Sequence, residues 1–155
     1  MITGTKRRSF IRPAALADAS EIARLAGQLG YPAEAKEISD RLESLLGRPN
    51  HFIAVAAAGE TERDLLGWIA AEERELLVAT PQVEIMGLVV DHAARGGGVG
   101  QGLVTAVERW AKTRQSRHVV VRSNVVRTES HPFYERLGYS RLKSQHVYLK
   151  EFRSF

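Results

Sequence analysis

The stretch VEIMGLVVDHAARGGGVGQG, residues 83–102, contains the signal that decides the fold of this chain. An apolar run predicts a strand over residues 82–90, and a short polar connector follows it. Arg95 then precedes closely set glycines, and an amphipathic helix begins at once. Because glycine costs chain entropy, such a cluster favours a function over an ordinary turn. Glycine N–H groups at the start of a helix form a site for a phosphate or pyrophosphate.

The spacing of these glycines excludes the two best-known phosphate loops. A P-loop needs Lys and then Ser or Thr after its last glycine, where this chain has Leu103 and Val104. A dinucleotide-binding fingerprint needs a third glycine where the chain has Gln101 or Leu103, depending on the register. The pattern that does match is Arg-x-x-Gly-x-Gly, from Arg95 to Gly100.

The length and composition indicate an ordinary globular chain. At 155 residues it is long enough for one domain, and we expect a loose tail over 1–7 and a single domain over 8–155. No apolar run approaches the roughly 18 residues of a membrane span. No apolar segment follows the basic residues near the N-terminus, so we expect no secretory signal and a cytoplasmic protein.

The residues that the chain lacks exclude several chemistries. It has no cysteine, which excludes disulfides, a thiol nucleophile and cysteine-based zinc sites. No grouping of His, Asp and Glu has a convincing metal-ligand spacing, so we predict no metal. The net charge of +4 suggests acidic ligands, such as nucleic acid or the phosphates of a CoA. The basic residues are scattered, which favours a solvated surface over a nucleic-acid footprint.

Hydrophobic periodicity predicts alternating strands and helices. Strands are expected at 9–12, 51–57, 65–72, 82–90 and 118–122, with a final strand over 139–150. Helices are expected at 16–29, between Pro32 and Gly47, after the glycine loop, and from Pro132 to Gly138. This order fits an α+β or α/β domain with a central sheet.

Two motifs in this order resemble the GNAT family of N-acetyltransferases, over residues 8–150. The first is the glycine motif from Arg95 to Gly100. The second combines Asn124 with HPFYERLGY, residues 131–139, and looks like the family's Asn…Phe-Tyr-x-x-x-Gly-Phe/Tyr signature. The resemblance implies the GNAT fold, a mixed, mostly antiparallel twisted sheet of about six to seven strands flanked by about four helices. It also implies acetyl-CoA as the cosubstrate, held by a splayed strand pair.

The resemblance also assigns the cofactor contacts. In such enzymes the strand before the loop separates from its neighbour at a bulge, and its free backbone groups bind the pantetheine arm. Here that role falls to Leu88, Val89 and Val90. The pyrophosphate is expected on the N–H groups of Gly96, Gly97, Gly98, Val99 and Gly100, with attraction from the helix dipole. Arg95 either contacts phosphate or stays solvated, and Asn124 either holds the pantetheine or adenine-side arm or forms an Asx-type turn.

Acetyl transfer to an amine needs an acid for the departing thiolate and a route for the amine proton. Without cysteine, direct attack in a ternary complex is the economical hypothesis. Tyr134 matches the family position from which a phenol points at the CoA sulfur, and a phenol pKa of about 10 keeps its proton available at neutral pH. The alternative for Tyr134 is a core aromatic. Phe133 beside it is expected in the core.

Glu84 is the candidate base. By strand alternation it shares a face with Met86, Leu88 and Val90, where burial would raise its pKa toward useful values. It could instead act through a water, bind the substrate ammonium, or form a salt bridge with a nearby Arg. His131 and His118 are weaker candidates. Arg127 and His146 are suggested only as lining for an acceptor pocket.

The same motifs bear on the acceptor. The local motifs look most like small-molecule acetyltransferases that act on a primary amine of an aminoalkylphosphonate or an aminoglycoside. Acidic residues crowd the second predicted helix and form either a polycation pocket or a solvated face: Glu34, Glu37, Asp40 and Glu43. The alternatives are a protein N-terminal or lysine acetyltransferase and a non-catalytic acyl-CoA-binding regulator. GNAT-like proteins are often dimers, so a homodimer is expected, without nucleic acid or membrane as a partner.

Overall fold

The structure is a computed structural model that describes residues 9–59, 64–123, 125 and 130–154. It divides into two compact units, one ending at Arg122 and one starting at Ser123. The predicted tail and Asn124 lie outside the described residues. None of the helices in the described ranges is long and apolar enough to cross a membrane.

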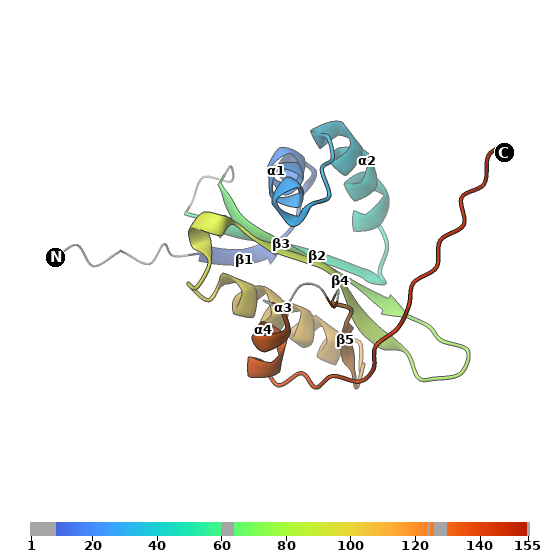
Figure 1. The fold of residues 1–155 in the computed structure, drawn as a ribbon. Helices are drawn as coiled ribbons and strands as arrows, with labels where there is room; N and C mark the ends of the chain where they lie inside the picture. The colour runs from blue at the N-terminus through green and yellow to red at the C-terminus, as the bar shows by residue number, and fades with distance from the viewer. Residues whose placement is uncertain (1–8, 60–63, 124, 126–129, 155) are drawn as a thin grey trace. The chain divides into compact units, whose positions relative to one another are not determined.

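In its described residues, the first unit contains one sheet and three α-helices (Figure 1). Its strands are β1 (Ser9–Pro13), β2 (His51–Ala58), β3 (Leu65–Arg74), β4 (Gln82–Val90) and β5 (Val119–Val121). Its helices are α1 (Ala19–Leu29), α2 (Ala35–Leu46) and α3 (Val99–Thr113), with short 3₁₀ turns η1 (Leu16–Asp18) and η2 (His92–Ala94). These elements occur where the sequence predicts them.

The ends of α1 follow from single residues. The sequence offers no good cap at Ala14 or Ala15, but Asp18 accepts a hydrogen bond from the Ala15 N–H at 2.8 Å and pairs with Arg12. This bond forms η1 first, so the α-helix itself begins only at Ala19. Gly30 ends the helix with a φ of 94°, a conformation that favours glycine.

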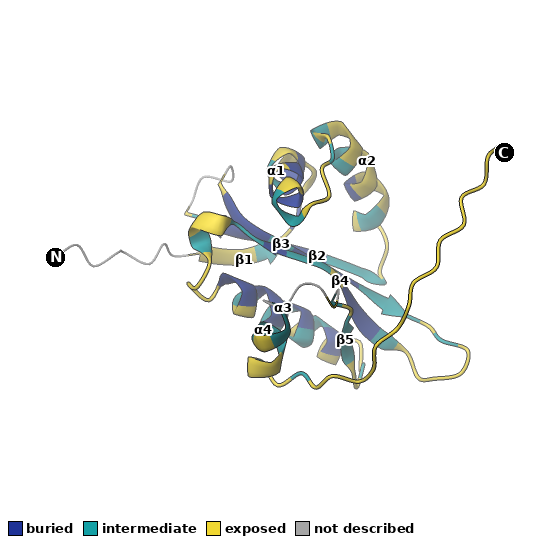
Figure 2. Ribbon diagram, in the orientation of Figure 1, coloured by how far each residue is buried: buried dark blue, intermediate teal, exposed yellow. Residues whose placement is uncertain are grey.

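The sheet has the strand order β1-β2-β3-β4-β5. The first three pairings are antiparallel, and β5 pairs in parallel with β4. α1 and α2 cover one face, where Ile22, Leu25 and Leu42 pack with Val55 and Val89. α3 covers the other face, and buried residues line both sides of the strands (Figure 2).

A β-bulge interrupts β4 at Met86. Opposite this point Ala70 pairs with Gly87 and Ala71 with Ile85, so Met86 has no partner of its own in β3. Because one extra residue reverses the alternation of side chains, the predicted face of Glu84 is wrong. Glu84 shares the α1 and α2 face with Gly87 and Val89, not with Met86, Leu88 and Val90.

The second unit contains α4 (Ser130–Arg136), which Gly138 follows with a φ of 91°. The predicted strand over residues 139–150 is not present: the structure assigns no strand to the described residues after α4. Its apolar side chains, Leu142, Val147, Tyr148 and Leu149, are exposed. Alternation alone does not make a strand, because a strand also needs an edge to pair with. The sheet therefore has five strands in the described residues instead of six to seven.

Candidate active site

The glycine loop joins β4 to α3 through η2. Gly96 and Gly98 have φ values of 80° and 85°, in the left-handed region that other residues avoid. Gly98 is the N-cap of α3, and no side chain caps this helix start. The first N–H groups of α3 have no partner within the helix, and a phosphate oxygen is a suitable acceptor for them. The loop therefore has the geometry that an anion site requires.

Between the bulge and the loop, the outer edge of β4 has no strand partner among the described residues. β4 pairs with β5 only at Val83, Glu84 and Ile85 within the described residues, so the two strands part at the bulge. The Asp91 N–H donates to the Leu66 C=O at 2.8 Å, and this bond shows which residues of β4 direct their backbone groups toward β3. By the alternation of an antiparallel ladder, the N–H and C=O groups of Leu88 and Val90 then face away from β3. Those of Val89 face β3.

Glu84 lies before the bulge, where β4 is still paired with β5, and its side chain is 1% exposed. Arg74 of β3 donates to its Oε2 at 2.7 Å, and the Nε of Arg122 donates to its Oε1. Burial acts to raise the pKa of Glu84, but the hydrogen bonds and charges of both arginines outweigh it and lower the pKa. The prediction of a raised pKa is wrong, and the salt-bridge alternative describes the side chain. A catalytic role for Glu84 stays a prediction.

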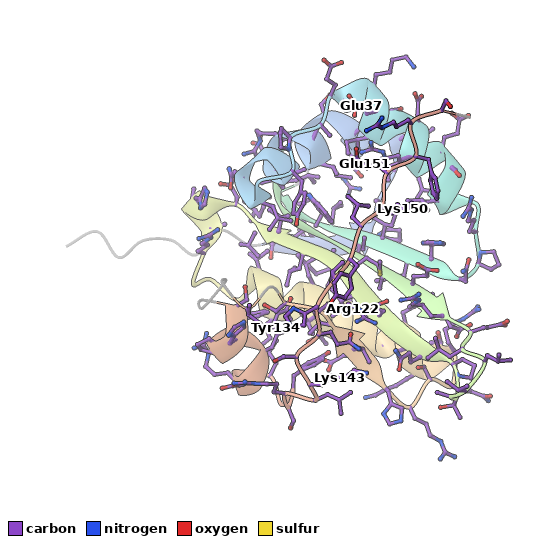
Figure 3. The ribbon with its side chains drawn as sticks, turned by 45° about the vertical axis from the view of Figure 1, so that its right-hand side comes forward. Glu37, Arg122, Tyr134, Lys143, Lys150 and Glu151 are labelled. Carbon is purple, nitrogen blue, oxygen red and sulfur yellow. The ribbon has the colours of Figure 1, made fainter. Side chains whose placement is uncertain are left out.

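Tyr134 lies on α4 in the second unit (Figure 3). Its ring makes edge contacts with the rings of Phe133 and Tyr139, at centroid distances of 5.0 and 5.8 Å. Burial raises the pKa of the Tyr134 phenol above its ordinary value. The hydroxyl is therefore protonated at neutral pH, as a general acid must be.

The other predicted residues divide between the two units. Arg95 is exposed on the glycine loop. The His118 C=O accepts from the Val83 N–H, which marks the start of the β4–β5 pairing. His131 and His146 belong to the second unit. Asn124 and Arg127 lie outside the described residues. No group of three or more His, Asp or Glu in the described ranges could hold a metal ion.

The acidic residues of α2 are exposed, and two of them form ion pairs within the helix. Lys36 pairs with Asp40 at 3.0 Å and Arg41 with Glu37 at 3.5 Å. Glu37 is labelled on α2 in Figure 3. Paired, exposed carboxylates of this kind suit the solvated-face interpretation better than a dedicated pocket.

An open groove of about 700 Å³ lies between α3 and the β1–β2 edge. Its walls include Ile11 and a stacked pair, Phe52 and Trp110, whose ring centroids are 5.4 Å apart. The groove does not include Glu84 or the open edge of β4, and the sequence did not predict it.

Sequence reasoning also missed a polar network at the entrance to the glycine loop. Arg24 and Gln28 of α1 both bond the Asp91 carboxylate, the first residue after β4. The signal was available, because Glu21, Arg24 and Gln28 have the spacing of one helix side. Their partner 63 or 67 residues further along could not be read from that spacing.

The family profile described as "Acetyltransferase (GNAT) family" matches residues 16–139. The chain therefore belongs to the GNAT acetyltransferase family, and the predicted fold, acyltransferase activity and acetyl-CoA cosubstrate are confirmed at this level. No protein of curated function matches the chain.

Solved structures share the fold. The aminoglycoside N-acetyltransferase AAC(6')-Iy in complex with CoA has a TM-score of 0.83 and 21% identity, covering 97% of this chain and 100% of that chain. AAC(6')-Ih from Acinetobacter baumannii has a TM-score of 0.80 and 19% identity, covering 94% and 99%. A transcriptional regulator from Bacillus halodurans C-125 has a TM-score of 0.77 and 24% identity, also covering 94% and 99%. At these identities the likeness shows the fold alone.

Proposed function

We propose that this protein moves an acetyl group from acetyl-CoA to the primary amine of a small molecule, by direct attack in a ternary complex. The observation that carries the proposal is the arrangement along β4. The bulge at Met86 ends the pairing with β5, the free backbone groups of Leu88 and Val90 follow, and the glycine loop comes next. One strand thus offers a partner for the pantetheine amides and, at its end, a site for the pyrophosphate.

The cofactor contacts in this proposal come from the backbone. Leu88 and Val90 bond the pantetheine arm as a neighbouring strand would. The N–H groups from Gly96 to Gly100 bind the pyrophosphate, and the dipole of α3 adds roughly 0.3–1 kcal/mol of attraction. Arg95 is exposed and carries a charge of the right sign for the same anion.

The chemical step needs one acid and one proton acceptor. The amine nitrogen attacks the thioester carbonyl, the C–S bond breaks, and the departing thiolate takes the phenol proton of Tyr134. The amine proton leaves to water or to Glu84. A carboxylate paired with two arginines is a weak base, and the 1% exposure of Glu84 means that any proton reaches it through water. Glu84→Gln tests this: a general base predicts that the acid limb of the kcat/KM pH profile disappears.

The proposal includes two classes of acceptor. Several structural neighbours are named as aminoglycoside acetyltransferases, which favours an amino sugar. The net charge of +4 and the ion pairs of α2 favour an anionic acceptor, such as an aminoalkylphosphonate. A screen of free-thiol release from acetyl-CoA with amino sugars, aminophosphonates and peptides separates these classes. Release with peptides alone supports protein acetylation instead, and no release with any amine supports a non-catalytic acyl-CoA-binding regulator.

Replacement of Tyr134 tests the acid. Tyr134→Phe keeps the ring contacts and removes the proton, so kcat should fall by about 100-fold or more while CoA affinity is retained. Tyr148→Phe is the matched control, because its ring is 90% exposed on the C-terminal segment. An unchanged kcat in Tyr134→Phe contradicts the assigned role.

A homodimer in the cytoplasm completes the proposal. GNAT-like proteins are often dimers, and the exposed apolar side chains after α4 provide surface for a contact. Sedimentation of the full chain tests the dimer: a single species of monomer mass at micromolar concentration contradicts it.

A further inference from the structure

A polar stripe on α1 faces the entrance to the glycine loop. Glu21, Arg24 and Gln28 lie about one turn apart along one side of the helix. The adjoining side of α1, including Ile22 and Leu25, is buried against the sheet. The stripe therefore has a fixed position relative to β3 and β4.

Asp91 receives hydrogen bonds from two of these residues and from its own loop. Arg24 Nη1 donates to its Oδ2 at 3.1 Å, and Gln28 Nε2 donates to its Oδ1 at 3.4 Å. The Ala93 N–H donates to the same Oδ1 at 3.1 Å, which closes the first turn of η2. The carboxylate thus joins α1 to the start of the loop.

The same helix also holds the backbone on either side of Asp91. Gln28 Oε1 accepts from the His92 N–H at 3.1 Å. Arg24 Nη2 donates to the Leu65 C=O at 3.1 Å, and Glu21 Oε1 accepts from the Leu65 N–H at 3.1 Å. α1 therefore bonds the first residue of β3 and the two residues that follow β4.

The glycines themselves cannot fix the loop through side chains. At its far end the loop is held by Val99, the first residue of α3, which is 5% exposed. At its near end, next to β4, the loop is held by the hydrogen bonds that side chains of α1 make to Asp91 and His92. An anion site made of N–H groups binds well only when those groups are already directed at one point.

We propose that Gln28 and Arg24 are positioning residues for the pyrophosphate loop: they hold Asp91 and His92 so that the loop N–H groups converge on the diphosphate of acetyl-CoA. This inference rests on the proposed function. Neither side chain needs to touch the cofactor. Their removal should weaken the recognition of the diphosphate and leave the recognition of the pantetheine arm unchanged.

The test compares the affinities of CoA and pantetheine, measured by calorimetry on the full chain. Gln28→Leu removes both hydrogen bonds, so the Kd for CoA should rise by about three- to tenfold. The Kd for pantetheine, which lacks the diphosphate, should stay the same. The acceptor that the thiol-release screen identifies allows a kinetic test. KM for acetyl-CoA should rise, and kcat should stay within about twofold of the parent value, because the loop does not touch the reacting atoms.

Two further variants separate positioning from general stability. Arg24→Ala should weaken CoA binding, and Arg24→Lys should restore part of it because the ammonium can still reach Asp91. Arg41→Ala is the matched control, since Arg41 also pairs with a glutamate on its own helix but does not approach the loop. Its Kd for CoA should equal that of the parent.

The inference is overturned if Gln28→Leu binds CoA as the parent does, or if CoA and pantetheine weaken equally. It is also overturned if Arg41→Ala weakens CoA binding as much as Arg24→Ala. Failure of the proposed function has a different signature, because the parent itself then shows no heat with CoA and no thiol release, and both proposals fall.

Discussion

The two ends of β4 hold their carboxylates in different ways. Glu84, two residues before the bulge, is 1% exposed and accepts from Arg74 of β3 and from Arg122, the residue after β5. Asp91, directly after the strand, is 17% exposed and accepts from α1 and from its own loop. The first carboxylate closes the strand pair, and the second holds a loop in place.

This contrast separates a stabilising function from a positioning one. A buried carboxylate that joins three strands should matter chiefly to folding. A less buried carboxylate at a loop entrance should matter chiefly to ligand affinity. Between them lie the bulge and the open edge of β4, where the proposed cofactor contacts are.

The largest effect is expected at the buried end. Glu84→Leu leaves two arginines facing an apolar side chain, and removal of one partner of a buried pair costs about 3–5 kcal/mol. Because the arginine side chains are 41% and 59% exposed, they can turn to water, and we expect the lower part of that range. Urea unfolding measures the loss. Glu43→Leu on the exposed side of α2 is the control, and an equal loss in both contradicts the account.

The bulge should tolerate little additional volume. A Cβ at Gly87 would lie 2.9 Å from Cζ3 of Trp68, so Gly87→Ala requires the indole to move. We expect a loss of about 1–3 kcal/mol from overpacking. Thermal unfolding measures it, and a variant as stable as the parent would show that the Trp68 ring shifts freely.

Acid stability should depend on both carboxylates. The pKa of each is lowered in the folded protein, so each stabilises the fold above its unfolded pKa of about 4. This stability is lost as the pH falls through the folded values. Glu84→Gln should flatten the loss of stability below about pH 4 more than Asp91→Asn does, because Glu84 is the more buried. Urea midpoints between pH 7 and pH 3 provide the comparison, and the opposite order contradicts it.

The smallest effect is expected inside the loop. A Cβ at Gly97 would lie 3.4 Å from the Ala94 carbonyl oxygen, at the limit of ordinary contact. Gly97→Ala should therefore change the stability by less than about 0.5 kcal/mol. Gly98→Ala, at a φ of 85°, should cost about 1 kcal/mol more. Equal stabilities of the two variants would show that the left-handed conformation of Gly98 is not required.

The sequence predicts most of the first unit because its signals are local. Each of these signals acts within a few residues: the alternation of apolar residues in β4, the glycine that ends α1, and the glycines that precede α3. The bulge at Met86 is not local, since it depends on how β3 pairs with β4, and for this reason the face of Glu84 was predicted wrongly. The strand expected over residues 139–150 failed for a related reason, because its pattern contains no information about a partner edge.

The candidate site shows the same division. The glycine positions and the strand that precedes them could be read from the chain. The partners of Glu84 and Asp91 could not, because Arg122 and Arg24 reach them from distant parts of the sequence. The acceptor is hardest to predict, since it depends on surfaces rather than on a motif.

The central claim is that the open edge of β4 and the glycine loop bind acetyl-CoA through its pantetheine arm and diphosphate. Calorimetric titration of the full chain with CoA tests it most directly. The account predicts one saturable site per chain, with pantetheine bound at least about tenfold more weakly, since the diphosphate contacts carry a large part of the affinity. No heat with either CoA or acetyl-CoA, or equal affinity for CoA and pantetheine, would contradict it.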